Sequence, residues 1–114
     1  MLKNQAKTKK KPVHKVLLER LQFLFNEEFW HIAQDPMSQG KRIDATINWV
    51  LDVRITCEII SQIKFTASAH IEVLAEMRKR MILAESIYAQ TIDHVLDVRE
   101  PIRLAVESLE ADEN

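Results

Sequence analysis

The feature that most limits the folds open to this chain is a run from Lys41 to Glu100 without glycine or proline. Sheet proteins need turn residues between strands, and the whole chain has one glycine and three prolines. Hydrophobic residues recur along the run at helical spacing: Ile43, Ile47, Val50, Val53, Cys57 and Ile60, then Leu74, Met77, Met81, Ala84, Tyr88 and Val95. The sequence therefore predicts an all-α fold.

A single helix over this run would be roughly 87 Å long. Such a rod cannot bury its hydrophobic faces in a compact monomer of 114 residues, so either the helix breaks or the chain dimerises. We favour a break in KFTAS, residues 64–68, where Thr66 or Ser68 can cap a new helix. One very long helix over 41–100, paired as a coiled coil, is the alternative.

A further helix is predicted from Val13 to Gln34, followed by a turn at DPMSQG, residues 35–40. Its hydrophobic face comprises Leu18, Leu21, Phe25, Phe29 and Ile32. Pro101 either ends the long run or begins a short helix, IRLAVESLE. Together these elements predict a three- or four-helix up-down bundle in one domain, residues 13–110.

The two ends of the chain are predicted to be polar tails. Residues 1–12 hold five lysines and no acidic residue, so we expect this tail to be disordered. Residues 111–114 are acidic and are expected to fray.

A nine-residue phrase occurs twice, as TINWVLDVR at 46–54 and as TIDHVLDVR at 91–99, with seven identical positions. We interpret it as a decayed internal duplication that supplies the same packing face twice. Coincidence remains the alternative, because helices draw on a small set of residue types.

The overall charge is close to balance, with 17 acidic and 16 basic residues, which argues against a generally basic nucleic-acid-binding surface. Two local clusters keep nucleic-acid contact as an alternative, because flexible basic segments can bind phosphate backbones. They are Lys7, Lys9, Lys10 and Lys11 in the tail, and Arg78, Lys79 and Arg80 in the run. Glu76 and Arg80 are four residues apart, a pair typical of an exposed helix face.

Glu28 and His31 form an E-x-x-H pair, the spacing with which carboxylate-bridged metal bundles hold an ion. Such sites need a second pair, which only a homodimer could supply here. A surface glutamate beside a partly buried histidine is the favoured interpretation. No nucleophile, base and orienting group can be assembled, and one glycine cannot build a phosphate loop, so we expect neither an enzyme nor a cofactor.

The single cysteine, Cys57, excludes an intramolecular disulfide and is predicted to be a buried apolar residue. No hydrophobic stretch approaches the roughly 20 residues of a transmembrane helix. The N-terminus has no signal-peptide core, so a cytoplasmic location is expected.

We therefore predict a non-enzymatic interaction or regulatory protein, associating with itself as a homodimer or with an unknown protein partner. Surplus hydrophobic surface is the reason for this prediction. The expected dimer or packing residues are Leu18, Leu21, Phe25, Phe29, Leu74, Met77, Met81 and Tyr88. The alternatives are a nucleic-acid-associated protein anchored by the lysine arm and a dimeric metal-binding helical bundle.

Overall fold

The computed structural model describes residues 11–89 and 98–112, with the backbone alone at 87–89. Within these ranges the chain is helical and contains no strand, which confirms the all-α prediction. The helices are α2 (Val13–Phe23), α3 (Phe29–Gln34), α4 (Gln39–Gln62), α5 (Ala67–Ala89) and α6 (Arg99–Ala111). A short π-helix, η1 (Leu24–Glu28), joins α2 to α3 without a break, so the predicted helix from Val13 to Gln34 is correct.

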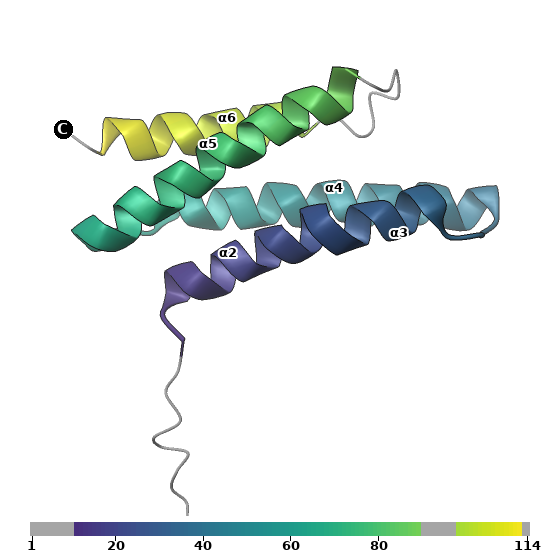
Figure 1. Ribbon diagram of the computed structural model, residues 1–114, viewed down its shortest axis with the longest axis horizontal. Coiled ribbons are helices and arrows are strands. Elements are labelled where there is room, and N and C mark those ends of the chain that lie inside the picture. The colour runs from purple at the N-terminus through teal and green to yellow at the C-terminus, as the bar shows by residue number, and fades with distance from the viewer. Residues whose placement is uncertain (1–10, 90–97, 113–114) are drawn as a thin grey trace, which may run out of the picture.

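The α2–η1–α3 segment, α4, α5 and α6 run in alternating directions, as predicted for an up-down bundle (Figure 1). The continuous α2–η1–α3 segment packs against α4, and α5 packs against α6. The two helix pairs are joined because α6 also contacts α4, and α2 also contacts α5. All the helices contribute to one hydrophobic core, in which the largest fully buried side chains include Trp49, Phe25, Leu21, Leu24, Ile60, Met77 and Ile102.

The first connection lies where the sequence places it, between α3 and α4. Asp35 is extended, with ψ of 141°, because it precedes a proline. The Ser38 hydroxyl then caps α4 by accepting a hydrogen bond from the Lys41 amide at 3.2 Å. Gly40 already lies inside α4 and has no positive φ, so the predicted turn ends two residues earlier than expected.

The break predicted at 64–68 is also confirmed, and the alternative of one helix over 41–100 is wrong. α4 ends at Gln62, and Ile63 turns to an extended conformation with ψ of 138°. The Thr66 hydroxyl accepts a hydrogen bond from the Ala69 amide at 3.3 Å, which caps α5. This break reverses the chain, so that α5 packs against α2 instead of extending away from the bundle.

Pro101 lies in the first turn of α6, two residues after its start at Arg99. A proline is tolerated there because the first amides of a helix have no acceptor within it. The structure therefore agrees with a short final helix, begun slightly earlier than predicted. Of the tails predicted at 1–12 and 111–114, residues 1–10 and 113–114 lie outside the described ranges, whereas Ala111 is the last residue of α6.

The two copies of the nine-residue repeat differ in secondary structure at their last two positions. Val53 and Arg54 lie within α4, whereas their counterparts Val98 and Arg99 form the cap and first residue of α6. Both valines are buried. The rest of the second copy, residues 91–97, lies outside the described ranges.

The π-helix is explained by a hydrogen bond from Trp49 of α4 to the Leu24 carbonyl of η1. The Phe29 amide bonds to the Leu24 carbonyl across the wider π turn. The buried indole N–H of Trp49 donates to the same carbonyl at 2.7 Å. Trp49 also contacts the rings of Phe25 and Phe29, with centroids 5.5 and 5.4 Å away. This contact fixes the register of α4 against η1.

We predict that Trp49→Phe lowers the free energy of unfolding by roughly 1–2 kcal/mol, because the buried hydrogen bond and part of the ring packing are lost. The matched control is Trp30→Phe, in which an exposed ring is changed; we expect less than about 0.5 kcal/mol. Urea denaturation followed by circular dichroism measures both. Equal stability of the two variants would contradict a central role for Trp49.

Candidate interaction surface

The residues predicted for a dimer or packing seam belong to the core of a single chain. Five of them, Leu18, Leu21, Phe25, Leu74 and Met77, are buried without any partner chain. Phe29 and Met81 are half-buried and pack against that core. The Tyr88 side chain lies outside the described part of the structure. The packing part of this prediction is therefore met within a single chain, and the part that assigns these residues to a dimer stays a prediction.

The basic cluster on α5 is engaged by carboxylates. Arg78 pairs with Glu110 of α6 at 2.7 Å, and Lys79 lies 3.8 Å from Glu76. Arg80 is only 5% exposed, so its assignment to an exposed helix face is wrong. This burial also removes Arg80 from any nucleic-acid contact surface.

In the N-terminal segment, Lys11 forms an ion pair with Glu19 at 2.8 Å. The other tail lysines proposed for nucleic-acid binding, Lys7, Lys9 and Lys10, lie outside the described ranges.

Arg80 is a buried charge that helps to hold α5 against η1. Its guanidinium donates to Glu76 at 2.8 Å and lies 5.8 Å from the centre of the Phe25 ring. Its Nε is buried without a hydrogen-bond partner among the described residues. Such a buried pair contributes little net stability, but removing one member leaves the other uncompensated.

We predict that Arg80→Ala lowers the free energy of unfolding by about 3 kcal/mol, because the partly buried Glu76 loses its shorter ion pair and keeps only Lys79, at 3.8 Å. Arg78→Ala, which removes an exposed ion pair, should cost less than about 1 kcal/mol. The double variant Arg80→Met with Glu76→Leu should recover most of the loss, because no charge remains buried. Denaturation with guanidinium chloride measures the free energy of unfolding of each variant. A double variant as unstable as Arg80→Ala would refute the prediction.

The proposed metal pair is not assembled into a larger cluster. His31 Nδ1 lies 2.8 Å from Asp35, and the hydrogen bond and charge of Asp35 raise the pKa of His31. Glu28 is half-buried at the end of the π-helix. Across residues 11–89 and 98–112, no three His, Cys, Asp or Glu side chains are grouped closely enough to hold a metal ion.

A second electrostatic contact joins α2 to α5. Lys15 donates to Glu72 at 2.6 Å, and His14 lies 3.2 Å from the same carboxylate. The hydrogen bond from Lys15, with its positive charge and a smaller effect of His14, lowers the pKa of Glu72. A lowered carboxyl pKa means that the ionised form favours the folded chain.

The contribution of Glu72 should therefore be complete above its ordinary pKa and should disappear as the pH falls through its lower, folded-state pKa. We predict that NMR titration places the Glu72 pKa below the usual glutamate range and that Lys15→Met raises it. Glu72→Gln should weaken the loss of stability in acid. An unchanged Glu72 pKa in Lys15→Met would show that the pair does not form in solution.

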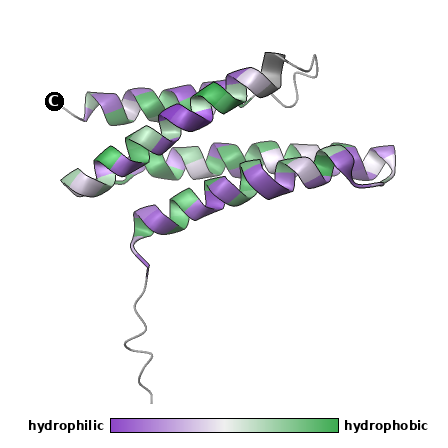
Figure 2. Cartoon of the chain, viewed as in Figure 1, coloured by the Kyte–Doolittle hydropathy of each residue, from purple (hydrophilic) through white to green (hydrophobic). Residues whose placement is uncertain are grey.

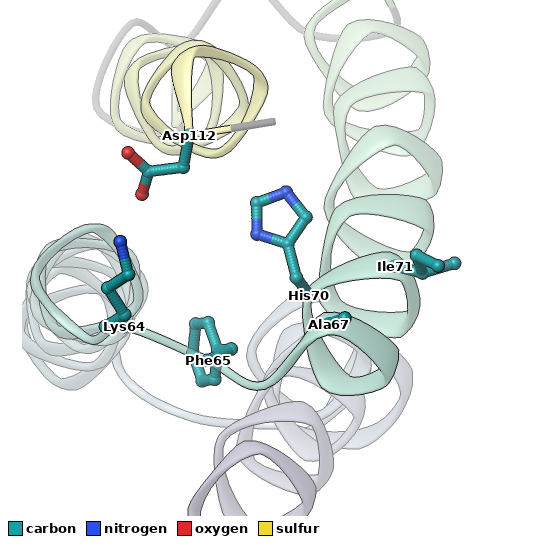
Figure 3. A pocket seen from close by; sticks show the side chains of 6 residues that line it. All are labelled: Lys64, Phe65, Ala67, His70, Ile71 and Asp112. Carbon is teal, nitrogen blue, oxygen red and sulfur yellow. The ribbon is translucent and has the colours of Figure 1, made fainter. Parts of the chain in front are cut away.

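A hollow of about 470 Å³ lies between the α4–α5 connection, α5 and the end of α6. Figure 3 shows Lys64 and Asp112 extending towards one another, with the His70 ring facing them from α5. Phe65 lines the hollow, whereas Ile71 points away from its centre (Figure 3). His70 Nε2 is buried without a partner among the described residues. A carboxylate, an ammonium group and an imidazole converge there, and no hydroxyl or thiol side chain is among the residues that line the hollow.

The clearest unassigned feature is a row of hydrophobic side chains on the outer face of α4. Its members, hereafter the α4 ridge, are Ile43, Ile47, Leu51, Ile55 and Ile59. They follow one another at intervals of four residues, so they form a continuous ridge that is inclined to the helix axis and turns by roughly 160° around it from Ile43 to Ile59. Each is 41–51% exposed, whereas a second row on the same helix, including Trp49, Val53 and Ile60, is buried.

The ridge has defined borders on both sides. Towards α2, Arg20 and Asp52 form an ion pair at 3.0 Å. Towards α6, a hollow of about 170 Å³ is lined by Arg54 and Glu58 of α4 and by Leu104 of α6, among others. Figure 2 shows that hydrophobic positions recur along the length of α4 among polar ones.

Sequence reasoning missed this ridge because it grouped Ile43 and Ile47 with Val53, Cys57 and Ile60 in one helically spaced series. The available signal was an excess of hydrophobic residues: α4 carries two rows, whereas a helix covered on one side needs only one. Which row faces inward could not be told from spacing, because both are helical.

The chain matches no protein-family model, no curated protein and no solved structure. Among the helices in the described ranges, none combines the length and hydrophobicity needed to cross a membrane.

Proposed function

We propose that this protein is a non-enzymatic association module that binds another protein along the α4 ridge. The observation that carries the proposal is the unbroken row of five half-exposed aliphatic side chains on one helix. Single exposed hydrophobic residues are normal on a protein surface, but contiguous rows mark interaction sites.

The rest of the surface supports the choice of this face. Ile71 and Ile82 on α5 are 68% and 73% exposed, but they stand eleven residues apart and form no row. The ridge is rigidly presented, because the opposite side of α4 is locked by Trp49 and by the buried residues around Val53. A helix with a preformed hydrophobic ridge can pack against a second helix at little cost in conformational entropy.

The two alternative functions draw less support. In the described part of the chain, the α5 basic cluster is paired with carboxylates, which leaves it poorly suited to phosphate. The E-x-x-H pair has His31 bonded to Asp35 and lacks a third ligand nearby among the described residues. Neither the basic cluster nor the E-x-x-H pair has the continuity of the ridge.

The test is a double variant, Leu51→Glu with Ile55→Glu, which places two carboxylates on the ridge without touching the core. We predict that association falls at least tenfold, because binding would then bury charge. It is measured by sedimentation of the purified chain and by capture of proteins from a nuclease-treated native lysate.

The matched control is Ile82→Glu, which adds a carboxylate at a more exposed isoleucine on α5. It should associate as the unaltered protein does, and all variants should show the same helical circular dichroism. The proposal is wrong if the unaltered chain is monomeric and the ridge variant still captures every protein that the unaltered chain captures.

A further inference from the structure

We infer that the hollow beside His70 binds a small zwitterion of the aromatic α-amino-acid class. Its volume of about 470 Å³ falls within the roughly 300–1,000 Å³ of small-ligand pockets. None of the described residues that line it belongs to the α4 ridge. This inference therefore goes beyond the proposed function and does not depend on it.

Two charges of opposite sign face each other across the hollow. Lys64 lies two residues beyond the end of α4, and Asp112 is the C-cap residue of α6. Figure 3 shows the two side chains extending towards one another, yet no ion pair joins them or links either to another described residue. A ligand that carries both charges can bind between them, with its carboxylate at Lys64 and its ammonium group at Asp112.

The ends of two helices give the hollow the same polarity as these side chains. Ala67, the first residue of α5, lines the hollow, so the positive end of that helix lies beside it. Asp112 stands at the negative end of α6. A simple anion would be attracted by one side and repelled by the other, and the same holds for a simple cation. The arrangement therefore favours a ligand with both charges.

His70 adds a directed hydrogen-bond donor on the positive side of the hollow. Its Nε2 is buried without a partner in the described part of the chain, whereas Figure 3 shows the other ring nitrogen facing the hollow. A buried N–H without an acceptor is costlier than a buried lone pair, so we expect the neutral ring to carry its proton on Nδ1. That N–H can donate to the carboxylate that Lys64 binds.

Phe65 provides the surface for the apolar part of the ligand. It is half-buried in the α4–α5 connection, and its ring lies between the Lys64 and His70 side chains in the close view of Figure 3. Ile71 points away from the centre of the hollow, so it does not compete for this contact. An aromatic ligand suits Phe65 because pairs of rings gain from edge-to-face or offset-stacked packing.

Binding should be weak, because Lys64 and Asp112 are exposed and the hollow opens to solvent. At the ligand efficiency of drug-sized molecules, the about twelve non-hydrogen atoms of L-phenylalanine give a dissociation constant on the order of 1 mM. Any transient pairing of the two exposed charges with each other is displaced at little cost.

The experiment is an NMR titration of the full chain with L-phenylalanine and with two analogues that each lack one charge. Hydrocinnamate lacks the ammonium group, and phenethylamine lacks the carboxylate. We expect L-phenylalanine to shift the Ala67 amide signal and the His70 ring signals, with saturation in the low millimolar range. Each analogue should bind roughly tenfold more weakly, because one charge of the hollow is then left without a partner.

Substitutions of the two charged residues separate their roles. Lys64→Met and Asp112→Asn should each weaken the binding of L-phenylalanine roughly tenfold. Asp112→Asn should also bind hydrocinnamate more tightly than the unaltered chain does, because the ligand carboxylate loses a repelling neighbour. The matched control is Lys79→Met, which removes a lysine of α5 that does not line the hollow and should leave the affinity unchanged.

Three results would overturn the inference. One is the absence of saturable shifts when L-phenylalanine is roughly tenfold above the expected dissociation constant. Another is equal affinity for L-phenylalanine and hydrocinnamate, which indicates a site for anions alone. The third is equal loss of affinity in Lys79→Met and Lys64→Met, which indicates a general effect of charge. Because the ridge variants leave the hollow unaltered, failure here leaves the proposed function standing.

Discussion

The hydrogen bond from the Trp49 indole to the Leu24 carbonyl is the contact on which the rest of the described fold depends. A buried indole N–H must find an acceptor, and helix carbonyls are normally occupied by the amide four residues on. In the π turn, the Leu24 carbonyl accepts a hydrogen bond from the Phe29 amide, five residues on, and it also accepts one from the Trp49 indole. One local irregularity thus sets the register between the first two helical segments.

The same cluster positions the second pair of helices. Phe25 is in contact with Trp49 on one side and with the Arg80 guanidinium on the other, so it links α4, η1 and α5. Ion pairs then join helices at the margins: Lys15 with Glu72, Arg20 with Asp52, and Arg78 with Glu110. These marginal pairs are solvent-exposed and contribute little each, so they align helices whose attraction comes from hydrophobic burial.

Because the row of α4 side chains that includes Trp49 is buried in the core, the α4 ridge is left exposed. A helix has room for about one buried stripe against two neighbours, and α4 is covered by α2–η1–α3 on one side and by α6 on the other. No remaining helix of the described chain is placed to cover Leu51. The exposed ridge follows from the way the core is filled, and this is why it is credible as a surface for another chain.

The sequence by itself determined the all-α class, the helix from Val13 to Gln34, and both described breaks at 35–38 and 63–66. These are local matters: a proline excludes helix at its predecessor, and a hydroxyl caps the amide three residues on. Only the tertiary structure decided which hydrophobic row of α4 is buried, that Arg80 lies inside while Ile43 lies outside, and that a π turn receives Trp49. Spacing along one helix cannot decide these points, because burial depends on which neighbouring helix covers each face, and that is set by contacts between residues far apart in the chain.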